Sequence, residues 1–107
     1  MSEDRLSIKL QALADPTRRA MLARLRQGEA TVSELAQPFE MSLPAISKHI
    51  KVLQQAGLIT RSRHAQQRPC QLSPEALREV DDWMKAYRDV WEDRLDRLDT
   101  YLKTVKE

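Results

Sequence analysis

The final segment of this chain carries a regular apolar stripe that only a long helix explains. Its members recur in steps of three and four residues, which is the spacing of a helix face that packs as a heptad seam. The stripe comprises Leu77, Val80, Met84, Tyr87, Trp91, Leu95, Leu98, Leu102 and Val105. Because Ser73-Pro74-Glu75 supplies a cap, a proline and an acid, we predict one helix over residues 74–105. From Val80 to Leu102 it would span about 33 Å.

The stripe changes width along the predicted helix. Trp83 and Val90 widen its first half, which we expect to cover the core of the domain. Its second half narrows to single leucines among charged residues, and such an exposed seam requires another helix. The simplest partner is the same helix of a second copy, assisted by a first helix over residues 4–14. The predicted dimer interface comprises Leu6, Leu10, Leu13, Trp83, Met84, Tyr87, Trp91, Leu95, Leu98 and Leu102.

Cap and stop signals define two short helices at the start of the chain. Asp15-Pro16 interrupts the first helix near residue 14 and begins a second, with Asp15 as the N-cap and Pro16 in the first turn. Gly28 ends this second helix. Its predicted buried side is Met21, Leu22 and Leu25.

Residues 31–57 read as two helices joined by a tight connection. Thr31 and Glu34 have the spacing of a capping box, and Pro38 limits the helix that they begin. Ser42 is the next N-cap, and Gly57 ends the helix that follows it. The inward residues of that helix are Ile46, Ile50 and Leu53. The pattern of residues 58–72 then predicts a β-hairpin, and Pro69 indicates that its returning strand is an edge strand or contains a bulge.

The charge of the chain is concentrated in one block. Residues 41–74 contain no Asp or Glu and hold a formal charge of +5 from Lys48, Lys51, Arg61, Arg63 and Arg68. Residues 1–40 are balanced, and residues 75–107 hold ten acids and seven bases, for a charge of −3. A basic block inside a balanced chain indicates a surface that binds a polyanion.

The helix pair lies partly within this basic block, a pattern typical of a DNA-binding helix-turn-helix whose second helix enters the major groove. The predicted DNA-contacting residues of that helix are Ser42, Leu43, Pro44, Ala45, Ser47, Lys48, His49 and Lys51. For His49, which flanks the inward stripe, we favour packing inside the subunit over a contact with DNA. The hairpin would act as a wing on the flanking DNA. Its predicted contacts are Arg61, Arg63, His64, Gln66, Gln67 and Arg68.

These segments together resemble the ArsR-type winged-helix repressors of bacteria. The resemblance rests on the residue runs 13–19, 42–53 and 56–59. It implies a mainly α fold with a small β-hairpin, in the order α-α-α-α-β-β-α. It also implies a homodimer joined by its first and last helices and an operator with two-fold symmetry.

The chain departs from the metal-sensing members of that family. Where they carry a Cys-x-Cys pair, this chain has Thr31 and Ser33, and its last helix has no His. The remaining candidates, Cys70, His49 and His64, do not make up a zinc ligand set. We therefore expect no metal site and no cofactor.

Other functional classes are less well supported. No apolar run approaches the ~18 residues of a transmembrane helix, the first residues are polar, and Cys70 is the single cysteine. We therefore expect a cytoplasmic protein without a membrane anchor. No catalytic constellation is visible, so we do not expect an enzyme. Two alternatives stay open: a sensor whose DNA is released by an unidentified small-molecule effector or by oxidation of Cys70, and a scaffold that uses the long helix to bind proteins.

Overall fold

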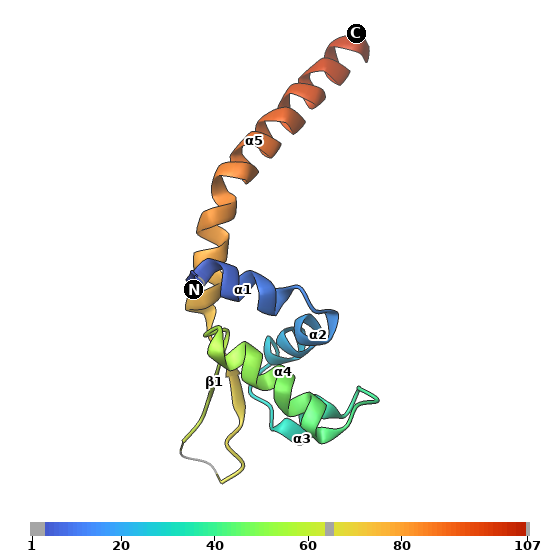
Figure 1. Cartoon of the computed structure of the whole chain (residues 1–107). Helices are drawn as coiled ribbons and strands as arrows, with labels where there is room; N and C mark the ends of the chain where they lie inside the picture. Colours follow the sequence, from blue (N-terminus) through green and yellow to red (C-terminus); the bar gives the residue numbers. More distant parts are fainter. Residues whose placement is uncertain (1–3, 64–65, 107) are drawn as a thin grey trace.

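The computed structural model describes residues 4–63 and 66–106. Within them, helices, hairpin and last helix follow in the order predicted from the sequence, which is thereby confirmed (Figure 1). The elements are α1 (Arg5–Leu13), α2 (Pro16–Leu25), α3 (Val32–Ala36), α4 (Leu43–Gln55), β1 (Ile59–Arg61), β2 (Cys70–Leu72) and α5 (Pro74–Lys106). None of the helices in this part of the chain combines the length and apolar character needed to cross a bilayer.

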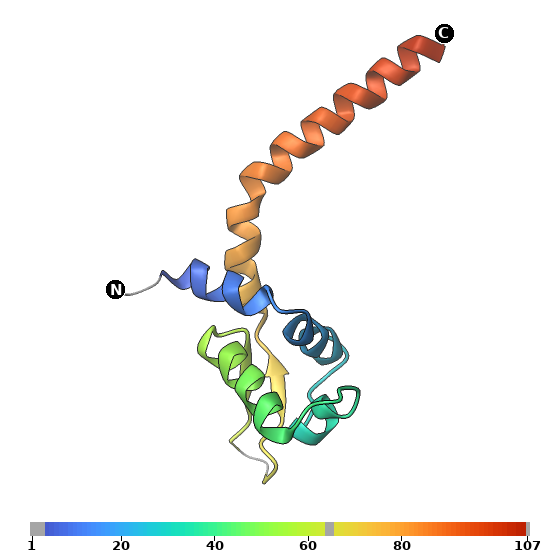
Figure 2. The same ribbon diagram turned by 45° about the vertical axis from the view of Figure 1, so that its right-hand side comes forward.

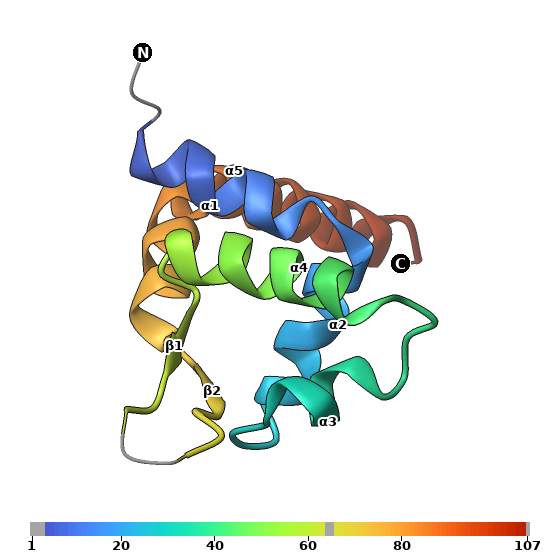
Figure 3. The same cartoon turned by 60° about the horizontal axis from the view of Figure 1, so that its bottom comes forward.

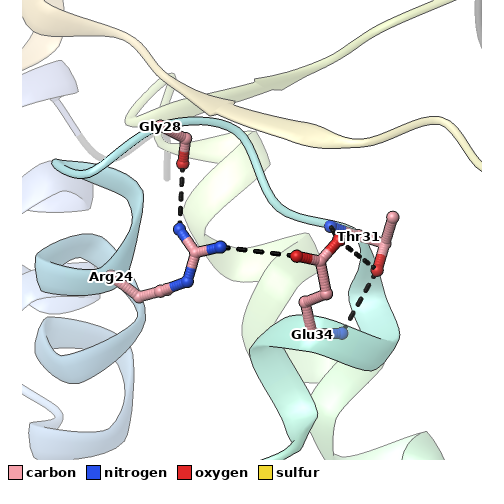
Figure 4. Close-up of polar contacts among 4 residues, drawn as sticks. All are labelled: Arg24, Gly28, Thr31 and Glu34. Atoms are coloured by element: carbon pink, nitrogen blue, oxygen red, sulfur yellow. Dashed lines mark hydrogen bonds and ion pairs between the residues drawn. The ribbon is translucent and has the colours of Figure 1, made fainter.

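Side-chain caps set the starts of the first four helices. The carboxylate of Asp15 accepts a hydrogen bond from the backbone N–H of Arg18 at 3.0 Å, so α2 begins where the sequence predicts. Thr31 and Glu34 form the predicted capping box. Figure 4 shows Arg24 of α2 joining this cap, with its guanidinium 3.4 Å from the Glu34 carboxylate. Gly57 follows α4 with a φ of +76°, a conformation that favours glycine and ends the helix.

The hydrophobic core lies between α2, α3, α4 and the hairpin. Its fully buried side chains of large volume are Met21, Leu35, Ile46, Leu53, Leu58, Ile59 and Cys70. All three predicted inward positions of α4 belong to this core. The recognition helix predicted from the sequence is therefore anchored along one whole face, and its opposite face is left to solvent.

The hairpin pairs β1 with β2 in an antiparallel register that places Thr60 opposite Gln71. Nothing in the sequence indicated that a third segment of the chain pairs with this hairpin. Ala30 forms an isolated bridge with Cys70, in which each backbone N–H donates to the carbonyl oxygen of the other residue, at 3.0 and 2.7 Å. The start of β2 thus lies between β1 on one side and the loop that precedes α3 on the other.

The last helix leaves the domain after its first turns. Ala76 and Val80 are buried, but Trp83 is 46% exposed and Val90 54%. The expectation that the wide first half of this helix covers the core is therefore wrong. The reason is that α1 packs across the base of α5, and α5 then continues away from the other helices (Figures 1 and 2). The molecule consequently extends 65 Å along its longest axis.

A buried lysine joins α1 to α5. Lys9 is only 4% exposed, and its Nζ lies 3.0 Å from Oε2 of Glu79. Arg5 approaches the same carboxylate oxygen at 3.7 Å. These cations hold the pKa of Glu79 below its usual range, with the Lys9 hydrogen bond as the main cause. The ion pair fixes where α1 crosses α5.

Candidate nucleic-acid interface

Helix α4 divides its residues between the core and solvent. Ile46, Ile50 and Leu53 are buried, whereas Ser47, Lys48 and Lys51 are exposed. Near the start of the helix, Ser42, Leu43 and Pro44 are exposed as well, and Ala45 is half-buried. The predicted outward residues therefore share the solvent side of a helix whose other side is held rigidly by the core.

The start of α4 suits an anionic partner. Ser42 is the N-cap, and its hydroxyl oxygen accepts from the backbone N–H of Ala45 at 3.3 Å. That bond leaves the hydroxyl hydrogen available for donation. The first turn of α4 contains no acidic side chain, and the N-terminal end of a helix is positively polarised.

The hairpin brings a second group of polar and basic side chains to solvent. Arg63, Gln66, Gln67 and Arg68 are exposed, while His64 lies outside the described residues. The half-buried Arg61 donates from Nε to the carbonyl oxygen of Arg68 at 3.1 Å. Arg68 itself adopts a positive φ of 45°. The Arg61 guanidinium thus braces the returning strand of the hairpin.

The helix and the hairpin meet at the end of the molecule opposite the tip of α5. Figure 1 shows α3, α4 and the hairpin at this end, and Figure 3 brings the same end forward. A hollow of about 270 Å³ lies between these elements. Its lining comprises Val32, Ser47, Ile50, Lys51, Gln54 and Arg61. Lys51 and Arg61 therefore place two cations from different elements around one concave surface.

His49 lies on the inner side of this interface. It is half-buried, and its Nδ1 is 3.2 Å from Nη1 of Arg18. Asp15 is farther away, with its Oδ2 3.9 Å from the same ring nitrogen. A guanidinium can only donate hydrogen bonds, and 3.9 Å exceeds hydrogen-bond distance, so we assign Nδ1 as the acceptor from Arg18. These contacts agree with the packing interpretation of His49.

Arg18 and Arg19 have roles that the sequence did not indicate. In the structure, Arg18 donates to the carbonyl oxygens of Gln11 and Ala12, and Arg19 donates to that of Leu13. Both side chains therefore donate to the carbonyls at the C-terminal end of α1, where the carbonyl oxygen of Gln11 also accepts from the backbone N–H of Ala14.

Cys70 is shielded from solvent. It is fully buried, and this burial raises the pKa of its thiol, with Arg61 exerting a weaker opposite effect. A thiol that stays protonated is a poor nucleophile and a poor redox sensor. The alternative of oxidative sensing through Cys70 is thereby weakened.

The predicted dimer interface is accessible in the single subunit. Its members on α5 are all exposed: Trp83, Met84, Tyr87, Trp91, Leu95, Leu98 and Leu102. Those on α1, namely Leu6, Leu10 and Leu13, are half-buried. The rings of Trp83 and Tyr87 pack against each other at a tilt of 52°, with centroids 5.4 Å apart. An exposed apolar surface of this length needs a covering partner.

Comparison with known proteins places this geometry among transcriptional regulators. A family model described as a helix-turn-helix domain matches residues 13–62. An HTH-type transcriptional regulator of Mycobacterium tuberculosis, Rv2034, is 46% identical over 67 residues, which are 63% of this chain and 63% of that protein. The chain thus spans less than two thirds of this relative.

Two further proteins are similar over most of their length. The transcriptional repressor SdpR of Bacillus subtilis is 36% identical over 74 residues, which are 69% of this chain and 82% of SdpR. An ArsR family transcriptional regulator with a known crystal structure, RHA00566, is 45% identical in sequence to this chain, and the two structures superpose with a TM-score of 0.76. That similarity covers 83% of this chain and 98% of the other.

Proposed function

This chain belongs to the ArsR family of winged helix-turn-helix transcriptional regulators, and on that premise we propose that it is a homodimeric repressor of transcription. Members of this family are DNA-binding regulators and not enzymes, which confirms the expectation drawn from the sequence. The observation that carries the proposal is the solvent face of α4. It presents Ser47, Lys48 and Lys51 opposite a buried stripe, inside a region without acidic residues.

The two halves of the interface have different proposed roles. Lys48 and Ser47 lie where a recognition helix approaches base edges, and a lysine there can donate to guanine. Arg63, Gln66, Gln67 and Arg68 on the hairpin would contact the backbone or minor groove beside the helix. Contacts of the first kind discriminate between sequences, whereas those of the second kind add affinity to every sequence.

Dimerisation follows from the exposed stripe of α5. A second copy supplies an identical stripe, so pairing of the two α5 helices, with α1 beside them, removes both apolar surfaces from water. A two-fold axis between the subunits then requires an operator with two-fold symmetry. Its half-sites would lie about one helical turn of DNA, or a multiple of it, apart.

The proposal is tested on DNA enriched by random-site selection with the purified protein. We expect an inverted repeat, and an affinity that falls steeply with salt as counterions are released. Lys48→Ala should weaken the selected site by about tenfold or more and random duplex much less. Lys103→Ala is a matched control, because it removes the same charge from the distal part of α5. Equal losses for Lys48→Ala on all sequences would contradict base reading.

The hairpin has a separate test. Arg63→Ala should weaken selected and random DNA by similar factors and reduce the slope of log affinity against log salt by about one. A wild-type dimer that binds no duplex even at low salt would overturn the proposed function and favour the protein-interaction scaffold.

A hollow on α5 favours one second candidate, a small-molecule effector. Met84, Tyr87, Arg88 and Trp91 line about 410 Å³ of mainly apolar space, beside one guanidinium. Met84, Tyr87 and Trp91 also belong to the stripe proposed to pair the subunits, so a ligand there would compete with the dimer contact. Release of operator DNA together with subunit dissociation, on addition of metabolites, would support this candidate. Release without dissociation would contradict it.

A further inference from the structure

One guanidinium connects the end of α1 to the recognition helix. Arg18, on α2, donates from Nε to the carbonyl oxygen of Ala12 at 2.7 Å and from Nη2 to that of Gln11 at 3.0 Å. Its remaining nitrogen, Nη1, lies 3.2 Å from Nδ1 of His49 on α4. Three helices thus meet at a single planar side chain.

The position of Arg18 is itself fixed. Asp15 caps α2 by accepting from the backbone N–H of Arg18 at 3.0 Å. This cap fixes the backbone position from which the arginine side chain projects. A guanidinium has its five N–H groups in a rigid plane. A shift of the α1 carbonyls therefore turns this plane and moves the donor that His49 requires.

The same α1 helix is tied to the proposed dimer surface. Lys9 and Arg5 both contact Glu79 of α5. On α4, which Arg18 contacts through His49, that histidine directly follows Lys48, the residue proposed to read bases. Two sets of polar contacts, joined by the α1 helix itself, therefore link α5 to Arg18 and the recognition helix.

We propose that Arg18 is a positioning residue that couples subunit association to the placement of α4 for DNA binding. The inference rests on the proposed function and assigns a specific route of regulation to it. When a partner subunit fixes α1 and α5, the Arg18 guanidinium is held in the orientation that supports His49. By reciprocity, DNA that holds α4 strengthens the dimer.

Arg19 offers a matched comparison within the same helix end. Its Nη1 donates to the carbonyl oxygen of Leu13 at 2.8 Å, and among the described residues no hydrogen bond from it to α4 is present. Arg18→Gln and Arg19→Gln each remove one cation from the C-terminal end of α1. The Arg18 substitution alone also removes the contact to His49.

The experiment measures the subunit dissociation constant with and without a duplex carrying one half-site. A single half-site cannot be bridged by both recognition helices, so any strengthening of the dimer reports coupling rather than bivalent binding. For the wild type we expect the half-site to lower the dissociation constant by about fivefold or more. Arg18→Gln should bring this factor close to one, and Arg19→Gln should preserve it.

A second pair of variants approaches the contact from α4. His49→Phe removes the acceptor, and His49→Gln keeps a carbonyl oxygen that can accept from Arg18. We expect the first to abolish the coupling factor and the second to retain much of it, and circular dichroism checks that both variants fold. These variants keep the test valid even if Arg18→Gln does not fold.

The outcomes separate the two proposals. Equal factors for Arg18→Gln and Arg19→Gln, or a factor of one in the wild type, would overturn the inference and leave DNA binding intact. Failure of the wild-type protein to bind the full operator would instead reject the proposed function.

Discussion

Single carboxylates at helix starts carry a pH dependence that follows from their hydrogen bonds. Asp4 accepts from the backbone N–H of Ser7 and Asp15 from that of Arg18, and these bonds are the main reason why the pKa of each is lowered. A carboxyl whose pKa is lower in the folded than in the unfolded state stabilises the protein above the unfolded value. This contribution is lost as the pH falls through the folded value.

Asp15→Asn separates the charge of this cap from its shape, because asparagine also caps helices well. We expect the free energy of unfolding of the wild type to decrease below about pH 4, and to decrease less steeply in the variant. Near neutral pH the two proteins should have similar stability. Urea unfolding followed by circular dichroism from pH 3 to 7 measures both slopes, and parallel curves would contradict the assignment.

The reactivity of Cys70 is also determined by its surroundings. Because the thiol is fully buried and its pKa is raised by that burial, we expect iodoacetamide to modify it slowly in the native protein. The same reagent should react rapidly in urea, where the thiol is exposed. Mass spectrometry of timed samples measures the two rates. Rapid modification under native conditions would restore the redox alternative.

At the scale of elements, the contact between α1 and α5 depends on a buried cation. Glu79→Gln would leave Lys9, which is 4% exposed, without its anionic partner. Lys9→Met would instead fill the same space with an apolar chain, and replacing a buried ion pair in this way is often neutral. We expect Glu79→Gln to destabilise the protein more than Lys9→Met in urea unfolding. The reverse order would show that the ion pair itself contributes little.

The helices and their ends were predictable because their signals are local. Asp15, Thr31, Ser42 and Gly57 act within a few residues of their own positions, and the structure confirms each of them. The side of α4 that faces inward was predictable for the same reason, since a helix period relates neighbours along one chain segment.

Features that depend on distant partners were not predictable. Lysine is normally exposed, and Lys9 is buried only because Glu79, far along the chain, lies beside it. The bridge between Ala30 and Cys70 has no periodic signal at all. The wide part of the stripe, with Trp83 and Val90, predicts a helix half that covers the core, but an apolar stripe does not reveal what covers it. The DNA contacts of the candidate site stay predictions, although the structure brings α4 and the hairpin to one end.

At the scale of the whole molecule, the exposed stripe of α5 determines the assembly. Leu98→Asp would place a charge within the proposed seam, and burying an unpaired charge costs several kcal/mol, or about 100-fold or more in the dimer dissociation constant. Thr100→Asp adds the same charge on nearly the opposite face of the helix and should have little effect. Analytical ultracentrifugation compares the two, and equal effects would place the dimer contact elsewhere.

The 65 Å length of the molecule separates its charges as well as its elements. The +5 block of residues 41–74 includes α4 and the hairpin, whereas the segment of charge −3 that begins at residue 75 forms the protruding helix. Such a body behaves as an electric dipole, and the field of a duplex would exert a torque that turns its cationic pole forward during diffusion. The DNA-binding end would then face the duplex when the two molecules meet. Added salt should therefore lower the association rate constant by a larger factor than it raises the dissociation rate constant.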